Sequence, residues 1–147
     1  SKEIERWITD LPHTRIERVL MFEGDVVIAD GAIEHHPHGW TRHIAEIRLV
    51  VARDRQGMGA GLVMLKELVA QAQAKKAELI KAQVYESHTA ALAVFQKLGF
   101  RMEAVLHGFA KDLQDERQNL VVMVRDVDEL WQAMEDMLWQ SDWRGDS

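Results

Sequence analysis

The sequence predicts an α+β fold in which a mixed sheet is flanked by helices. Segments with alternating apolar residues occur both before and after segments with helical spacing, in the order strands, helix, strand, helix, strands, helix. The central strand–helix–strand unit indicates two parallel strands joined by a right-handed crossover. The length of 147 residues suits one domain with a sizeable core, so we expect residues 1–147 to form a single domain.

The N-terminal part is predicted to form one helix followed by three strands. The spacing of Ile4, Trp7 and Ile8 predicts a short helix over Lys2 to Thr9, which Leu11-Pro12 ends. Strands are then expected over Arg18 to Phe22, Val26 to Ile33 and His43 to Ala52. Two connections follow from the residue types: a tight turn at Glu23-Gly24-Asp25 and a polar tip from Glu34 to Trp40.

The C-terminal part alternates helices and strands. Apolar residues at helical spacing predict a helix of about four turns beginning at Gly61 and a second over His88 to Leu98, which Gly99 closes. The second helix is expected to bury a stripe of Ala91, Leu92, Phe95 and Leu98. The remaining elements are strands over Leu79 to Tyr85, Met102 to Lys111 and Asn119 to Val124, and a final amphipathic helix over about 127–142.

Composition narrows the classes of function. The formal net charge of −6 argues against a nucleic-acid partner, because phosphate backbones bind to basic faces. No apolar run approaches the length of about 20 residues that spans a membrane, and no signal-peptide pattern opens the chain. The sequence has no cysteine, hence no disulfide framework and no thiol nucleophile. We expect a cytoplasmic protein.

A glycine-rich loop lies between a predicted strand and the first long helix. Its sequence is Arg55-Gln56-Gly57-Met58-Gly59-Ala60-Gly61. Three glycines in five residues let the backbone approach an anion, and the free N–H groups of the helix's first turn then point at it. The loop is neither a Walker A loop nor a G-x-G-x-x-G fingerprint. The alternative is a glycine-rich turn without a ligand.

Two segments together resemble the GNAT acyltransferase family. The first, Gln56-Gly57-Met58-Gly59-Ala60-Gly61, matches the family's Gln/Arg-x-x-Gly-x-Gly/Ala at this junction. The second runs from His88 to Gly99-Phe100, about thirty residues later, where the family has an Asn, an Ala, Leu-Tyr and a helix closing in Gly-Phe. The resemblance covers about Arg18 to Arg125, and the family's first strand is missing or displaced.

The resemblance implies that the chain binds acetyl-CoA as acyl donor. The amides from Gly57 to Gly61, including Met58, Gly59 and Ala60 and preceded by Gln56, would hold its pyrophosphate. Main-chain groups of Leu49, Val50 and Val51 would pair with the pantetheine arm, which requires their strand to splay from its neighbour. His88, Ala91 and Phe95 on the second helix would complete the cofactor contacts.

Acetyl transfer to an amine needs a base, and the resemblance places Glu46 in that role. The alternative is a solvent-facing glutamate paired with Arg48 or Arg42. Backbone N–H groups near Val50 and Val51 would meet the oxyanion. The family's tyrosine acid is replaced here by Phe95, and the only tyrosine, Tyr85, lies on the preceding strand. A slow enzyme, a substitute acid such as His88 or a water molecule, and a binding-only protein all stay open.

Two further groups of residues have competing interpretations. His35, His36, His38 and His43 are interpreted first as solvated loop residues, next as acceptor recognition and last as metal ligands, since no metal-site spacing such as H-E-x-x-H is present. No metal is predicted. Trp131 is expected to pack in the core, whereas Trp139 and Trp143 leave a homodimer interface open.

The sequence therefore predicts an N-acetyltransferase that moves the acetyl group of acetyl-CoA to a primary amine of a small molecule or a protein. The main alternative is a non-catalytic acyl-CoA-binding or sensory module of the same fold. A second alternative is an interaction domain whose glycine loop is only a turn. The acceptor, the preferred acyl length and the oligomeric state cannot be predicted from the sequence.

Overall fold

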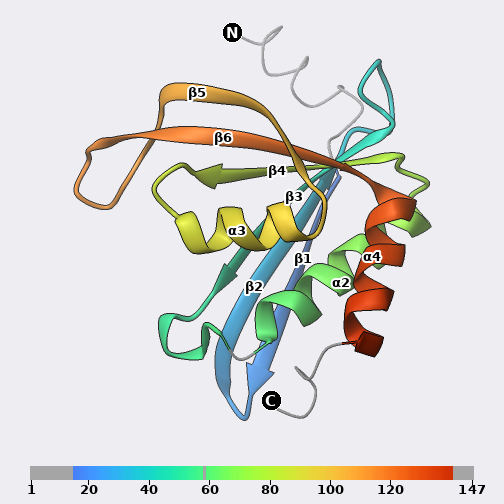
Figure 1. The fold of residues 1–147 in the computed structure, drawn as a ribbon, viewed down its shortest axis with the longest axis horizontal. Coiled ribbons are helices and arrows are strands. Elements are labelled where there is room, and N and C mark those ends of the chain that lie inside the picture. Colours follow the sequence, from blue (N-terminus) through green and yellow to red (C-terminus); the bar gives the residue numbers. More distant parts are fainter. Residues whose placement is uncertain (1–14, 58, 141–147) are drawn as a thin grey trace, which may run out of the picture.

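The computed structural model describes residues 15–57 and 59–140. They form a six-stranded sheet in the order β1-β2-β3-β4-β6-β5, and the helices α2, α3 and α4 all lie in front of this sheet in Figure 1. The strands are β1 (Arg15–Glu23), β2 (Val26–His35), β3 (Ile44–Val51), β4 (Leu79–Tyr85), β5 (Arg101–Lys111) and β6 (Arg117–Asp126). The helices are the 3₁₀ turn η1 (Arg53–Arg55), α2 (Ala60–Ala74), α3 (Thr89–Lys97) and α4 (Val127–Gln140).

The predicted mixed sheet is confirmed. β3 and β4 are the parallel pair, joined through α2, and the other neighbouring strands are antiparallel. Gly24 has a φ of +62° in the β1–β2 turn, a left-handed conformation that glycine adopts without steric cost. β2 runs two residues further than predicted, so the polar tip starts at His36 and not at Glu34.

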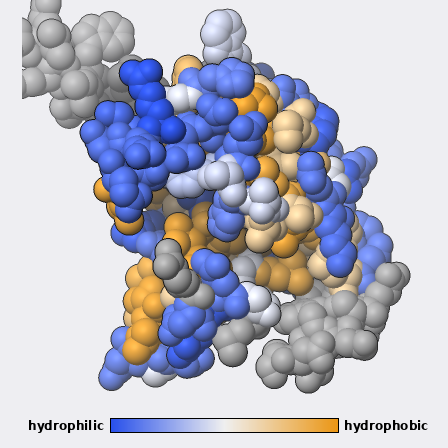
Figure 2. Space-filling model, turned by 60° about the vertical axis from the view of Figure 1, so that its left-hand side comes forward, coloured by the Kyte–Doolittle hydropathy of each residue, from blue (hydrophilic) through white to orange (hydrophobic). Residues whose placement is uncertain are grey.

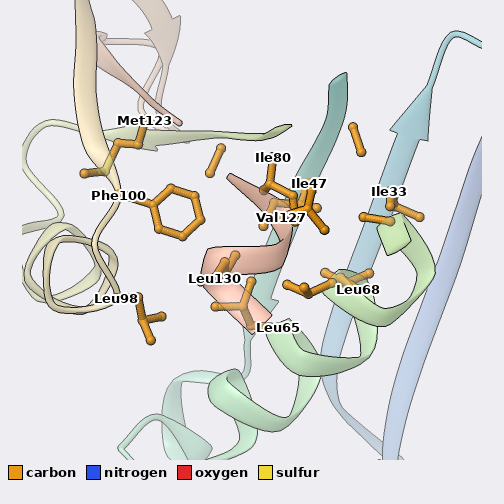
Figure 3. Packing of buried hydrophobic residues seen from close by; sticks show 14 of the residues in the cluster. Ile33, Ile47, Leu65, Leu68, Ile80, Leu98, Phe100, Met123, Val127 and Leu130 are labelled. Atoms are coloured by element: carbon orange, nitrogen blue, oxygen red, sulfur yellow. The ribbon is translucent and has the colours of Figure 1, made fainter. Parts of the chain in front are cut away.

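The hydrophobic core lies between the sheet and the pair α2 and α4. Alternate residues of β2, β3 and β4 are buried on the helix side, among them Ile33, Ile47 and Ile80, and they meet Leu68 of α2 and Leu130 of α4 (Figure 3). The period of two in the strands and the period of 3.6 in the helices thus point at the same core. Burial of these side chains supplies most of the drive to fold.

Gly31 on β2 allows α2 to lie close to the sheet. A Cβ atom at this position would stand 2.8 Å from Met64 Sδ and 3.1 Å from Leu68 Cδ1, both shorter than ordinary van der Waals contact. The glycine therefore sets how closely α2 approaches β2.

The second helix of the central region is less buried than predicted. None of the residues within α3 is buried; Leu92 and Phe95 are half-buried against the core, and only Leu98, just past the helix, is fully buried. Of the apolar stripe expected along this helix, the part that packs fully is therefore Leu98, at the C-terminal end of α3. Gly99 has a φ of +87° there, as expected for a glycine that ends a helix.

The remaining predicted elements occur in the structure where it describes them, although β1 begins three residues earlier than predicted and β6 extends two residues further at each end. Trp131 packs against the core, and Lys66 Nζ lies 5.2 Å from the centre of its ring. Some predictions concern parts of the chain outside the described residues. These are the N-terminal helix, the missing or displaced first strand, the side chain of Trp139 and the whole of Trp143. Among residues 15–57 and 59–140, no helix is both long and apolar enough to cross a membrane.

The tip of the β5–β6 hairpin is organised by Asp112. One of its oxygens, Oδ1, accepts backbone N–H groups of Gln114 at 2.9 Å and Glu116 at 3.0 Å, and Oδ2 accepts the side-chain amide of Gln118 at 2.9 Å. Hydrogen bonds to a carboxylate favour its charged form. The bond from the Glu116 backbone, followed by that from Gln118, lowers the pKa of Asp112 below its usual value.

Because the pKa of Asp112 is lowered, we expect the free energy of unfolding to depend on pH through this residue. A carboxylate with a lower pKa in the folded state stabilises that state above its unfolded pKa of about 4, and loses the contribution as pH falls through the folded pKa. Asp112→Asn should therefore lower the free energy of unfolding at pH 7 and have a smaller effect at pH 3, as measured by urea denaturation at both pH values. Asp115→Asn, in the same turn but without these three bonds, is the control, and an equal loss at both pH values would contradict the assignment.

Candidate functional site

The glycine loop begins where β3 leaves the sheet. Ala52 N–H donates to the Ile28 carbonyl at 2.8 Å, and Arg55 N–H donates to the Ala52 carbonyl at 2.9 Å, which closes the turn η1. Gly57 and Gly59 follow with φ values of +82° and +84°. Both are left-handed conformations that other residue types rarely adopt, so the path of the loop depends on these two glycines. Met58 between them lies outside the described residues.

The N-terminus of α2 is open towards this loop. Gly59 is its N-cap residue, no side chain caps the helix, and its first turn carries no acidic residue. The first amides of a helix have no partner within the helix, and its dipole adds a partial positive charge at this end. A 15-residue helix that begins after such a loop therefore presents a suitable main-chain site for an anion. Gln56, Gly57, Gly59, Ala60 and Gly61 are brought together there.

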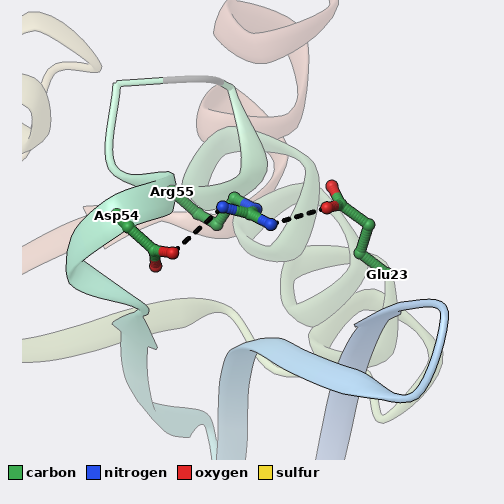
Figure 4. A network of polar contacts seen from close by, with 3 residues as sticks. All are labelled: Glu23, Asp54 and Arg55. Atoms are coloured by element: carbon green, nitrogen blue, oxygen red, sulfur yellow. Dashed lines mark hydrogen bonds and ion pairs between the residues drawn. The ribbon is translucent and has the colours of Figure 1, made fainter.

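Side chains anchor the loop to the neighbouring hairpin. The guanidinium of Arg55 donates from Nη2 to Glu23 Oε1 at 2.6 Å and from Nη1 to Asp54 Oδ2 at 3.0 Å (Figure 4). The hydrogen bond to Glu23, with the negative charges of Glu23 and Asp54, raises the pKa of Arg55. Local sequence pattern does not predict this contact, because Glu23 and Arg55 are 32 residues apart.

The strands β3 and β4 separate beside the loop, as the resemblance requires. They pair only from Ile44 opposite Leu79 to Ile47 opposite Ala82, although β3 continues to Val51 and β4 to Tyr85. Beyond Ile47 the two strands point in different directions, and α3 lies at the opening between them (Figure 1). Within the described residues, the last part of β3 therefore has no strand partner on its β4 side.

The direction of the main-chain groups corrects one expectation. Residue pairs in an antiparallel ladder alternate between those that exchange hydrogen bonds and those that do not. The bond from Ala52 to Ile28 shows that this pair exchanges hydrogen bonds, so the pair two residues earlier on β3, Val50 opposite Asp30, does so too. Hence the N–H and C=O groups of Leu49 and Val51 face the opening, whereas those of Val50 face β2. Leu49 can therefore offer both main-chain groups to a ligand between the strands, and Val51 its N–H group, because the Val51 carbonyl accepts from Gln56 Nε2.

The three elements around the opening each carry an exposed apolar side chain. Val50 of β3, Val63 of α2 and Val94 of α3 are exposed. Figure 2, which turns this side of the molecule forward, shows apolar surface between hydrophilic regions above and below. A ligand with an uncharged arm and an anionic end would match this distribution, because the arm would cover apolar surface and the anion would lie at the helix end.

Glu46 lies on the sheet face opposite α2. Its neighbours Ala45 and Ile47 are buried on the helix side, and Glu46 is half-buried between Glu34 of β2 and Lys81 of β4. The alternative pairing with Arg48 or Arg42 is absent: Arg48 contacts Glu34 at 3.7 Å and Arg42 donates to the Gly39 carbonyl. Within the described part of the chain, no hydrogen bond or ion pair occupies the Glu46 carboxylate.

The aromatic residues near α3 have structural contacts. Phe95 packs edge-to-face on the buried ring of Phe100, with 4.9 Å between ring centres. Tyr85 lies on the other face of the sheet, and its hydroxyl donates to the Lys111 carbonyl at 3.2 Å. Tyr85 therefore does not take the place that Phe95 occupies. His88 is the exposed N-cap residue of α3, without a side-chain capping bond, and Ala91 is half-buried one turn later.

The histidine-rich segment differs in part from the expectation. His35 is buried and not solvated, and its Nε2 lies 2.8 Å from the Arg42 carbonyl, closing the loop after β2. His36 and His38 are exposed, and His43 is half-buried. Among the residues that the structure describes, no three potential ligands are placed to hold a metal ion.

A polar hollow of 440 Å³ opens at the other end of α2. Its lining comprises Gln73, Lys76, Ala77, Glu78, Asp126 and Asp128. Three carboxylates against one ammonium group make it unsuitable for a phosphate. The glycine loop and the opening beside β3 are therefore the better candidate site.

Comparisons with known proteins agree on one family. The model of the "Acetyltransferase (GNAT) family" matches residues 2–100. Similar solved structures include a ribosomal-protein-alanine N-acetyltransferase from Brucella melitensis, at 20% identity and a TM-score of 0.66 over 85% of this chain and 75% of that one. Another is a putative acetyltransferase from Salmonella typhimurium with its cofactor acetyl-CoA, at 18% identity and a TM-score of 0.64 over 87% and 73%. No curated protein matches the chain.

The two glycines at the start of α2 give a paired prediction. Gly59→Ala should lower the free energy of unfolding by about 1–2 kcal/mol, because alanine is strained at a left-handed φ. Gly61→Ala should be neutral or raise it by up to about 1 kcal/mol, because a helical alanine is favoured over glycine. Its Cβ would stand 3.5 Å from Val51 Cγ2, an ordinary contact. Urea denaturation of both variants would test this, and effects of the same sign would contradict the conformational account.

Proposed function

The chain belongs to the GNAT acetyltransferase family, and on this premise we propose that it transfers the acetyl group of acetyl-CoA to a primary amine. The observation that carries the proposal is the end of β3–β4 pairing at Ile47, directly beside the uncapped start of α2. Unpaired main-chain groups suit an arm that contains amides, and free helix amides suit a diphosphate. Both lie along one path that the glycine loop connects.

We assign the binding of acetyl-CoA mainly to the backbone. The amides from Gly57 to Gly61 take the diphosphate, and the main-chain groups of Leu49 and the N–H group of Val51 take the pantetheine arm. This assignment is consistent with a chain of net charge −6, because the partial charges of a helix end attract an anion without basic side chains. His88, Ala91 and Phe95 border the arm from α3.

The proposed chemistry needs few side chains. Acetyl-CoA supplies an activated thioester. Glu46 removes a proton from the amine, directly or through a water molecule, and its unoccupied carboxylate suits this role. An N–H group of Leu49 or Val51 donates to the thioester oxygen as that oxygen gains negative charge. A thiol with a usual pKa of about 8.5 can leave without an acid, which suits a site where Phe95 has no proton to donate.

A non-catalytic module that binds acyl-CoA is the second candidate. Phe95 favours it, since this side chain packs on Phe100 and cannot act as an acid. Such a module would bind acetyl-CoA but would release no thiol in the presence of an amine. The two candidates therefore separate in a kinetic assay and not in a binding assay.

Binding is the first prediction of this proposal. Calorimetric titration with acetyl-CoA should give a Kd in the range of about 1–100 μM, and Gly59→Glu should weaken binding by at least about 100-fold, because it places a carboxylate and a strained backbone at the helix end. Gly39→Glu is the matched control, since Gly39 also has a positive φ, +94°, and open space around it. No binding by the unmodified protein would exclude the acetyltransferase function.

Catalysis is the second prediction. Glu46→Gln should reduce amine-dependent release of CoA thiol by about 100- to 10,000-fold, the usual contribution of a general base, and leave the Kd for acetyl-CoA within about twofold. Glu34→Gln, on the neighbouring strand opposite Glu46, is the control. The amine panel should include peptides with N-terminal alanine, as the Brucella melitensis protein is named for that acceptor.

The outcomes distinguish the candidates. If Glu46→Gln keeps its rate, the base is another group. If every amine fails although acetyl-CoA binds, the non-catalytic module is the better account.

A further inference from the structure

The side chain of Gln56 makes a contact that the proposed chemistry does not use. Its amide Nε2 donates to the main-chain carbonyl of Val51 at 3.1 Å. The contact joins the last residue of β3 to the residue just before Gly57. It therefore spans the turn η1, which connects the sheet to the glycine loop.

The Val51 carbonyl is available because of the strand geometry. It faces away from β2, as the bond from Ala52 to Ile28 requires, and β4 has already diverged after the pair Ile47–Ala82. A main-chain carbonyl without a ladder partner is free to accept from a side chain. Within the described chain, Gln56 supplies the donor.

The turn is consequently closed by two bonds of different origin. Arg55 N–H to the Ala52 carbonyl closes its backbone at 2.9 Å, and the side chain of Gln56 closes it again at 3.1 Å, one residue further out on each side. The ion pair of Arg55 with Glu23 fixes the outer side of the same turn. With both sides held, the chain enters Gly57 from a defined position and direction.

We infer that Gln56 is a positioning residue: its side-chain amide, bonded to the Val51 carbonyl, holds the glycine loop so that the free amides at the start of α2 face the diphosphate. The inference rests on the proposed function for the ligand, although the anchor itself can be tested without one. Arginine also carries N–H donors on a long side chain, so it can replace glutamine as the donor to the Val51 carbonyl.

The test uses three variants of the full chain. Gln56→Met keeps the length of the side chain and removes the donor, and Gln56→Arg restores a donor. Gln132→Met is the matched control, because Gln132 on α4 also donates from Nε2, to Asp136 at 3.1 Å, far from the loop in sequence. The melting temperatures of all three variants should lie close to that of the unmodified protein, since one exposed hydrogen bond contributes little to global stability.

The first measurement is amide hydrogen exchange of the protein without ligand. The amide of Arg55 makes the hydrogen bond of the turn, to the Ala52 carbonyl, and the amide of Ala52 makes the adjoining bond to Ile28 of β2. Gln56→Met should speed their exchange about three- to tenfold, the effect of losing one hydrogen bond. Gln56→Arg should return it to within about twofold, and Gln132→Met should leave it unchanged. Equal exchange in Gln56→Met and the unmodified protein would overturn the inference.

The second measurement is acetyl-CoA binding and turnover. Gln56→Met should raise the Kd and the KM about three- to tenfold and leave kcat within about twofold, because the loop holds the diphosphate and not the reacting atoms. A fall in kcat at unchanged KM would contradict the positioning role. If the unmodified protein binds no acetyl-CoA, the proposed function fails, whereas the exchange measurement still decides whether Gln56 anchors the turn.

Discussion

The divergence of β3 from β4 is the constraint on which the rest of the site depends. Four residue pairs, from Ile44–Leu79 to Ile47–Ala82, hold the two strands together, and after them β2 is the one described strand that still pairs with β3. A sheet interior normally satisfies both sides of each strand. Here the main-chain groups of Leu49 and Val51 are left facing an opening, and the chain turns directly from that opening into an uncapped helix. The candidate site is thus made by an interruption of regular structure.

Much of this arrangement could be predicted from the sequence, because its elements follow from periodicity. The alternation of apolar residues predicted both ends of β2, β3 and β4 with an error of no more than two residues. Glycines indicated the positive-φ positions at which α2 starts and α3 ends. The loop was identifiable because glycine is one of the few residue types whose presence alone indicates a backbone requirement. Membership of the family was predicted from the same loop and the helix that follows β4.

Contacts between distant residues could not be predicted in this way. The pairing of Arg55 with Glu23 and the burial of His35 depend on which loops meet in space, and neither follows from local pattern. The direction of the Val50 main chain depends on the phase of hydrogen bonding between β2 and β3, which sequence does not specify. The exposure of α3 differed from prediction because the core covers Leu92 and Phe95 only in part, and apolar spacing does not show how closely a helix packs.

The uncapped start of α2 also affects how an anion would reach the protein. The attraction of a helix end is short-ranged and falls off within about one turn, whereas the whole molecule carries a net charge of −6 that repels anions over the Debye length, about 10 Å at 0.1 M salt. Added salt screens the long-range repulsion before it weakens the contact at the helix end. Capture of an anionic ligand at this site would therefore become faster with moderate ionic strength, the reverse of the electrostatic steering that basic binding sites produce.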